Sequence, residues 1–155
     1  MNNFILEHDN FRLSVSPDLI TPKSRRKLIL DLEESRENYL KDFNAKLDKA
    51  AAIEKEYEKA LKKKDKESME AYDERIKPIT EEKTAKLREL DGDEGIASTT
   101  GLTFDTFKIV SSIGSRDVTL EVFENLPTYK IDGFLYSVLK HCKIAFADQF
   151  APTNE

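Results

Sequence analysis

The residues that could perform chemistry are few and scattered, beginning with two histidines and one cysteine. His8 lies in a predicted turn, and His141 directly precedes Cys142 on a predicted helix. Adjacent helical positions point in different directions, whereas a cysteine–histidine nucleophile pair needs hydrogen-bond contact, so we interpret Cys142 as a core thiol. Two histidines and one cysteine also make a closed zinc site implausible.

Two glycine-containing segments are the remaining candidates for binding an ion. DGDEG at 91–95 has alternating acids but lacks the later ligands and bidentate glutamate of a calcium loop, so we interpret it as a helix stop. Gly114 in SSIGSR could leave amides free for a phosphate, but a hairpin turn is the simpler explanation. There is no phosphate-binding glycine motif and no GxSxG. We predict no enzyme activity, cofactor or metal; an active site assembled across subunits stays open but has no positive support.

Two groups of basic residues are the candidate partner-binding surfaces. The first is a predicted turn with four lysines: Lys62, Lys63, Lys64 and Lys66. It could meet an acidic groove or a phosphate backbone, although a solvated turn also explains it. The second is at the start of a predicted helix: Arg25, Arg26 and Lys27. Positive charge there has the wrong sign for the helix dipole, which suggests an acidic partner, most simply the acidic flanks of the same chain.

A charged stretch without glycine, from Thr21 to Asp91, carries both groups. Thr21 can cap its first turn, and Pro22 suits the first helical position. Apolar residues then recur at steps of three or four, which indicates the narrow stripe of a coiled coil. We call the following residues the hairpin seam: Phe43, Leu47, Tyr57, Leu61, Tyr72, Ile76 and Leu87.

The stripe lapses at KKKDKES, residues 62–68, which we interpret as a turn between helices at 22–64 and 66–90. Asp65 could cap the second helix, and Gly92 could end it. The alternative is one continuous helix to Lys77 that is broken at Pro78. In the hairpin, the first helix overshoots its partner, and its apolar beginning around Leu28 and Leu32 is expected to be enclosed by a globular base.

The flanking segments predict that base. Residues 4–7 and 11–15 read as two strands, and residues 103–110 and 117–123 read as a second hairpin, which together would form a four-stranded antiparallel sheet. Residues 117–126 could instead form a short helix. A helix at 132–146 is expected to pack on the sheet. The predicted class is α+β, a helical hairpin projecting from a small antiparallel sheet covered by a C-terminal helix, with parts at 1–21, 22–91, 92–150 and 151–155.

Composition and charge support a binding protein with a small core. Hydrophobic residues are 39% and charged residues 35% of the chain, against roughly 45–50% and about 25% in an average globular domain. Residues 22–91 hold 19 basic and 18 acidic residues, net +1, which leaves 6 and 12 in the flanks, net −6. Acidic flanks repel phosphate backbones. The single cysteine and the lack of a secretory signal or membrane-length apolar run predict a soluble cytoplasmic protein.

Two resemblances concern the predicted hairpin. In layout it looks like bacterial factors that insert a helical hairpin into the secondary channel of RNA polymerase, although those act through acidic residues at the hairpin tip and this tip is basic. The stretch EAYDERIKPITEEKTAKLREL is similar in character to helices of phage Gam-type host-nuclease inhibitors, over about a seventh of the chain. Neither resemblance assigns a site residue.

We therefore predict a non-catalytic assembly or adaptor protein that contacts another protein or a second copy of itself through the hairpin or the acidic base, and no membrane. A phage origin, in the host cytoplasm or the virion, is a hypothesis. The alternative is a nucleic-acid-directed inhibitor or DNA-end-binding protein that uses the basic turn.

Overall fold

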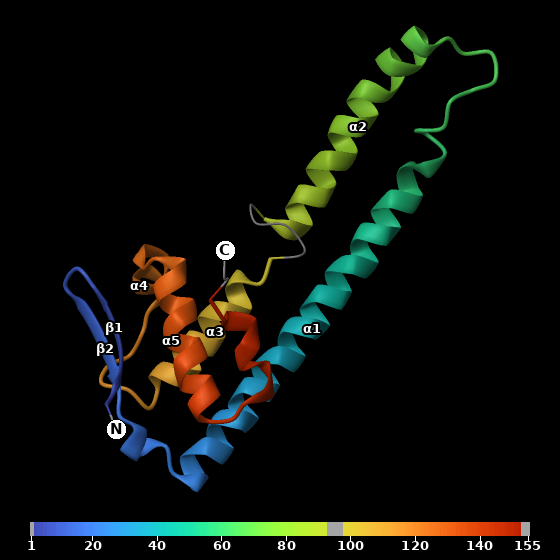
Figure 1. Cartoon of the computed structure of the whole chain (residues 1–155). Coiled ribbons are helices and arrows are strands. Elements are labelled where there is room, and N and C mark those ends of the chain that lie inside the picture. Colours follow the sequence, from blue (N-terminus) through green and yellow to red (C-terminus); the bar gives the residue numbers. More distant parts are fainter. Residues whose placement is uncertain (1, 93–97, 153–155) are drawn as a thin grey trace. The chain divides into compact units, whose positions relative to one another are not determined.

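The protein consists of two compact units in a computed structural model that describes residues 2–92 and 98–152 (Figure 1). Unit 1 comprises Met1–Glu37 and Thr99–Glu155, and unit 2 comprises Asn38–Ser98. The long helix α1, Pro22–Glu58, contributes its first part to unit 1 and the rest to unit 2. Strands and helices both occur in unit 1, so the predicted α+β class is confirmed.

Unit 1 begins with the β-hairpin that the sequence predicted. Strands β1 (Phe4–His8) and β2 (Phe11–Val15) pair antiparallel, from Phe4 opposite Val15 to His8 opposite Phe11. The two residues between the strands form the turn, and Asp9 adopts a left-handed φ of 51° there. Positive φ is what the tight turns of two-residue hairpins require, and Asp tolerates it better than most residues.

Polar groups cover both edges of this hairpin. On the β2 edge, the Ser115 N–H donates to Ser14 O at 2.9 Å, and the Ser14 N–H donates to Ser115 Oγ at 3.0 Å. On the β1 edge, Lys130 Nζ donates to Glu7 O at 2.9 Å. Unpaired strand edges invite pairing with other chains, and these contacts occupy part of each edge.

The predicted second pair of strands is wrong, because both segments are helical. Residues 103–110 lie in α3 (Thr100–Ser111), and residues 117–123 overlap α4 (Leu120–Asn125). In α3 the buried residues recur at helical steps, including Phe107 and Val110. Thr119 Oγ1 caps α4 by accepting from the Val122 N–H at 3.3 Å. The alternative of a short helix at 117–126 is therefore confirmed, and the sheet has two strands.

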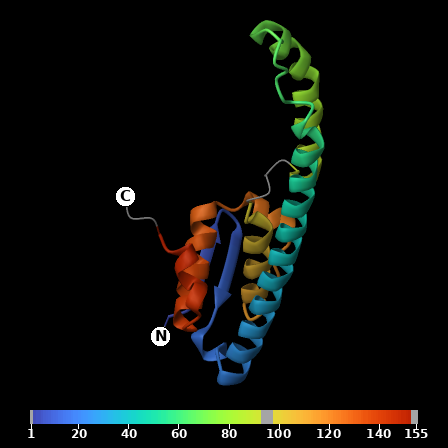
Figure 2. The same ribbon diagram turned by 90° about the vertical axis from the view of Figure 1, so that its right-hand side faces the viewer.

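Helix α5, Thr128–His141, contributes five buried residues to the unit 1 core and lies beside the β-hairpin (Figure 2). It packs against β1, α3 and the 3-10 helix η2, Ala145–Phe150. A second 3-10 helix, η1 at Pro17–Leu19, leads from β2 to α1. The expected helix on the sheet is confirmed, although it begins before Asp132 and ends before Phe146. Edge-to-face contact between Phe107 and Phe134, with centroids 6.0 Å apart, joins α3 to α5.

The start of α1 belongs to the same core. Thr21 Oγ1 accepts from the Ser24 N–H at 3.1 Å, which confirms the predicted cap. Leu28 and Leu32 are 3% and 1% exposed, so the expectation that a globular base encloses this part of the helix is confirmed for them. Leu30 on the same stretch is 59% exposed.

Unit 2 is a helical hairpin formed by the rest of α1 and by α2, Met69–Asp91. The turn between them confirms the hairpin, and α2 continues through Pro78, so a continuous helix broken at that proline is wrong. The predicted cap Asp65 is also wrong, because Ser68 Oγ accepts from the Ala71 N–H at 3.1 Å. Gly92 ends α2 with φ 62°, as predicted, while residues 93–95 of DGDEG lie outside the described residues.

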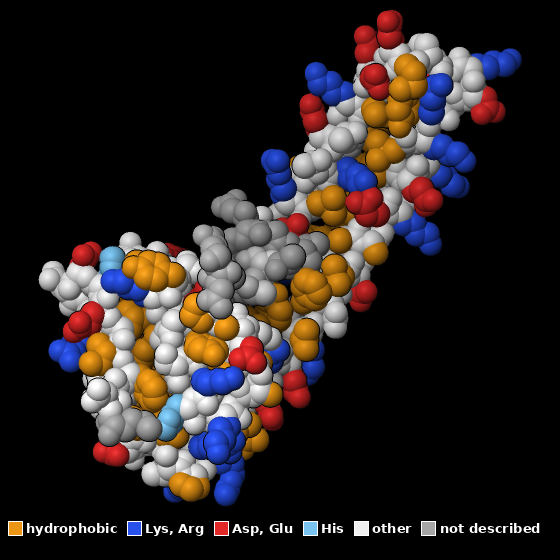
Figure 3. All heavy atoms as spheres, viewed as in Figure 1, with side chains coloured by type: hydrophobic (Ala, Val, Ile, Leu, Met, Phe, Trp, Pro, Cys, Tyr) orange, Lys and Arg blue, Asp and Glu red, His pale blue; other side chains and the backbone are white. Residues whose placement is uncertain are grey.

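Hydrophobic side chains form a stripe along the hairpin of unit 2, with basic and acidic side chains on both sides (Figure 3). The two helices are joined near the middle by ion pairs from Lys83 to Glu54 at 2.5 Å and from Lys86 to Glu56 at 3.0 Å. Away from the turn, the Tyr39 hydroxyl donates to Ser98 O at 2.9 Å. Across residues 2–92 and 98–152, no helix has both the length and the apolar character needed to cross a membrane.

Two glycines give a matched test of unit 1 packing. A Cβ on Gly114 would lie 3.0 Å from Leu13 Cδ1 and 3.1 Å from Ser14 O, so Gly114→Ala should destabilise by about 1–3 kcal/mol. A Cβ on Gly133, inside α5, would meet no atom within 4 Å. Gly133→Ala should therefore stabilise by roughly 0.5–1 kcal/mol. Urea unfolding followed by circular dichroism measures both, and equal stabilities for the two variants would contradict this packing.

Candidate nucleic-acid or protein interface

The strongest candidate site is the turn between α1 and α2, residues 59–68, which we call the basic turn. It contains five lysines and two acids, and all five lysines are exposed. No carboxylate within the described ranges lies at ion-pair distance from the four predicted partner-binding lysines: Lys62, Lys63, Lys64 and Lys66. Their charge therefore faces solvent uncompensated.

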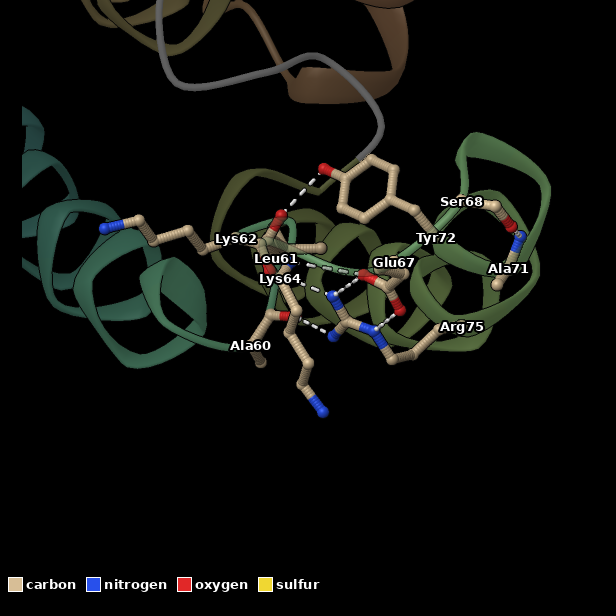
Figure 4. A network of polar contacts seen from close by, with 9 residues as sticks. All are labelled: Ala60, Leu61, Lys62, Lys64, Glu67, Ser68, Ala71, Tyr72 and Arg75. Atoms are coloured by element: carbon tan, nitrogen blue, oxygen red, sulfur yellow. Dashed lines mark hydrogen bonds and ion pairs between the residues drawn. The ribbon is translucent and has the colours of Figure 1, made fainter.

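A single arginine of α2 holds the backbone of the basic turn (Figure 4). Arg75 Nε and Nη2 donate to the two carboxylate oxygens of Glu67, at 2.7 and 2.9 Å. The same guanidinium donates to Ala60 O at 2.7 Å and to Lys62 O at 2.9 Å. Because a planar guanidinium offers donors in a fixed geometry, one side chain fixes both halves of the turn.

Both carboxylate oxygens of Glu67 accept hydrogen bonds within this network. Hydrogen bonds from Arg75 lower its pKa against the opposing effect of burial, and the Lys64 N–H, 3.3 Å from Glu67 Oε1, lowers it further. The same pair raises the pKa of Arg75. Since the two charges cancel at short range, Glu67 does little to offset the lysines around it.

Tyr72 and Ser68 complete the ordering of the basic turn. The Tyr72 hydroxyl donates to Leu61 O at 2.7 Å, so consecutive carbonyls beyond the end of α1 receive side-chain donors from α2. Ser68 caps the first turn of α2. Figure 4 shows the side chains of Lys62 and Lys64 extending away from the Arg75–Glu67 pair. Side chains of α2 thus fix the backbone of the turn, while its lysine side chains are exposed to solvent.

The second predicted group lies in unit 1 and has a different setting. Arg25 Nε donates to Cys142 O at 2.6 Å, at the carboxyl end of α5. Lys27 pairs with Asp31 at 3.4 Å, and Arg26 is exposed. A helix carboxyl end carries partial negative charge, so Arg25 meets a backbone carbonyl where an acidic side chain was expected. The two basic groups belong to different units.

The seam residues line the hairpin but are not equally covered. Tyr57 is 6% exposed, while Leu47 is 42% exposed. The remaining members are half-buried: Phe43, Leu61, Tyr72, Ile76 and Leu87. Lys86 lies 5.0 Å from the centroid of the Tyr57 ring, and the Tyr57 hydroxyl, followed by Glu56, raises the pKa of Lys86.

The residues that the sequence suggested for catalysis or ion binding make packing or backbone contacts instead. Cys142 is 1% exposed, and burial raises the pKa of its thiol, which confirms the interpretation as a core residue. The His141 ring packs against Phe4 with centroids 5.4 Å apart. The Gly114 N–H donates to Ser111 O, so this amide is not free for a phosphate. In the described part of the chain, no group of three or more metal-ligating side chains converges.

Sequence reasoning missed Arg75 and Glu67, which organise the basic turn. Their eight-residue separation spans a turn and a helix start, so no helical or strand period connects them. The only available signal was an arginine nearly two turns into the second helix, next to an apolar stripe. No family model, curated protein or solved structure matches the chain, so its function has to be inferred from these contacts alone.

Arg75→Lys tests whether the guanidinium orders the basic turn. Lysine keeps the charge but cannot donate to Glu67 and two carbonyls at once, so we expect faster amide exchange across residues 60–67 and a lower Tm. Arg88→Lys is the matched control, because Arg88 is an exposed arginine of the same helix. Hydrogen–deuterium exchange with mass spectrometry makes the measurement. Equal exchange in both variants would show that Arg75 does not hold the turn.

Proposed function

We propose that the protein acts by binding rather than catalysis, as an assembly or adaptor protein whose hairpin docks against another helix. The observation that carries this proposal is the incomplete burial of unit 2. Among its described residues, only Tyr57 is buried, with 6% of its surface exposed. Two helices can cover one side of each other's apolar stripe, and a further helix is the usual way to cover the rest.

Exposed apolar side chains on the hairpin support this proposal. Leu40, Leu47 and Met69 are 53%, 42% and 59% exposed. Burying apolar area contributes roughly 25 cal/mol per Å², so even partial coverage of several such side chains favours association. The ion pairs Lys83–Glu54 and Lys86–Glu56 fix the register of the two helices, which gives a partner a defined surface.

A second copy of the chain is the first partner to test. Homo-oligomers with closed symmetry are the commonest assemblies, and a second hairpin offers a complementary stripe of the same length. An assembly of this kind also agrees with the balanced charge of residues 22–91, which neither repels nor attracts a like surface strongly.

Leu47→Lys tests the seam. Because Leu47 is already partly exposed in the single chain, we expect little change in folding but a loss of association. Ala45→Lys is the control, since it adds the same charge at an exposed position on the opposite side of α1. Light scattering after gel filtration gives the mass of each variant. A wild-type chain that stays monomeric would contradict self-association, and a Leu47→Lys variant with the oligomeric mass of the wild type would show that the seam is not the interface.

The ordered basic turn favours a second candidate function, binding to a nucleic-acid backbone. Four exposed lysines on a backbone held by Arg75 can approach phosphates without a large loss of loop entropy. Each neutralised phosphate releases counterions and makes binding steeply dependent on salt. The net charge of −6 on the flanks opposes this function, so such a contact is expected within residues 22–91.

Neutralising Lys62, Lys63, Lys64 and Lys66 with glutamine tests the second function. For a labelled DNA duplex, the slope of log K against log salt should fall in magnitude by up to about 4, because each contact contributes roughly 0.9. A control variant neutralises four exposed lysines of α1: Lys41, Lys46, Lys49 and Lys55. Fluorescence anisotropy between about 50 and 200 mM salt gives the slopes. Absence of wild-type binding, or equal slopes for both variants, would exclude the basic turn.

A further inference from the structure

A cavity of about 750 Å³ lies within unit 1, between the start of α1 and the end of α5. One face of α1 contributes Arg25, Arg26, Ile29, Leu30 and Glu33, and the segment after α5 contributes Lys143. Three permanent cations therefore face one carboxylate. The cavity uses no residue of unit 2 and is independent of the function proposed above.

Lys143 occupies a backbone conformation that a lysine rarely adopts. Its φ is 58°, and it stands directly after the C-cap Cys142 of α5. The Lys143 N–H donates to Lys140 O and the Ile144 N–H donates to Leu139 O, both at 3.0 Å. This pair of bonds defines a Schellman motif, in which the left-handed position is usually glycine because other side chains strain the backbone there.

Folding alone does not explain a lysine at this position. Lys143 is exposed, and its ammonium has no hydrogen-bond or ion-pair partner in residues 2–92 and 98–152. Backbone strain at a residue whose side chain makes no structural contact suggests that the side chain has a functional contact instead. Lys143 is one of the residues that line the cavity, so its charge lies at the edge of this site.

The two arginines of the cavity retain their charge as well. Arg25 is oriented by its 2.6 Å bond to Cys142 O, a neutral acceptor, and neither Arg25 nor Arg26 has a carboxylate partner among the described side chains. Lys27, the next cation along α1, pairs with Asp31 and does not line the cavity. The cations that face the cavity are thus the unpaired ones.

The order of side chains along α1 defines the ligand class. Arg25 and Arg26 come first, Ile29 and Leu30 lie one turn later, and Glu33 lies one turn beyond them. We propose that this cavity binds an oxyanion, a phosphate or carboxylate, carried on an apolar body. The oxyanion meets the guanidinium groups and Lys143, since guanidinium geometry suits both oxyanions. The apolar body covers Ile29 and Leu30, and Glu33 disfavours ligands that carry a second negative charge at that end of the cavity.

The test is an NMR titration of the ¹⁵N-labelled full chain with phenyl phosphate. We expect saturable shifts of the backbone amides of residues 20–30 and 141–144. Benzoate in a parallel titration distinguishes carboxylate from phosphate, phenol should cause no saturable shift, and inorganic phosphate should bind more weakly because it lacks the apolar body. Absence of saturable shifts with both phenyl phosphate and benzoate, or equal binding of phenyl phosphate and inorganic phosphate, would overturn the proposal.

Lys143→Gly separates binding from stability. Glycine relieves the left-handed strain, so the Tm should stay equal or rise, while affinity for phenyl phosphate should fall by about tenfold through loss of one charged contact. Arg26→Gln should weaken binding similarly. The control is Lys23→Gln, which removes an exposed cation of the same helix that does not line the cavity. If Lys143→Gly and Arg26→Gln bind phenyl phosphate no more weakly than Lys23→Gln, the cavity is not the site.

Discussion

In an antiparallel pair, each helix can cover only part of the other's apolar stripe. The remaining apolar surface of unit 2 is therefore exposed to solvent. Tyr57 is the only buried residue among those described in unit 2, so the hairpin depends on polar contacts to fix its geometry. The Tyr39 hydroxyl bonds to Ser98 O away from the turn, Lys83 and Lys86 bridge to α1 in the middle, and Arg75 holds the turn. These bonds give direction and register, whereas apolar burial would supply most of the free energy. A hairpin with defined register and incomplete burial is suited to receive a further helix.

In unit 1 the β-hairpin needs support from other elements, because two strands alone cannot form a stable sheet in water. Its hairpin becomes stable by packing Leu6, Leu13 and Val15 into a core shared with α3, α5 and the start of α1. The burial of α1 changes along its length for this reason. Leu28 and Leu32 are enclosed within unit 1, while most of the helix beyond Glu37 is half-buried or exposed. One continuous helix thus contributes buried residues to the core of unit 1 and largely exposed or half-buried residues to unit 2.

Elements that depend on local contacts could be predicted from the sequence. The β-hairpin followed from two short strand-like segments around His8-Asp9-Asn10, although His8 belongs to β1, and the turn of unit 2 followed from a lapse in a long helical period. The strand predictions for 103–110 and 117–123 were wrong because a window of seven or eight mixed apolar residues fits both a helical and a strand period. For the first segment, the packing of Phe107 on Phe134 favours the helix. Neither the Arg75–Glu67 pair nor the contact of Arg25 with Cys142 O, 117 residues away, leaves a periodic trace in the sequence.

The exposure of the lysines in the basic turn could be predicted from sequence. How much positive charge each site presents depends also on whether its arginine is paired with a carboxylate, which the sequence does not show. Arg75 is bound to a carboxylate, so its charge and that of Glu67 cancel, and the five lysines together with Asp65 determine the field of the turn. Arg25 is bound to a carbonyl, which orients the guanidinium but leaves its full charge in place. A neutral acceptor therefore fixes a cation without neutralising it. By this criterion the paired arginine of unit 2 is structural, whereas Arg25 and the unpaired cations beside it are free to attract an anion.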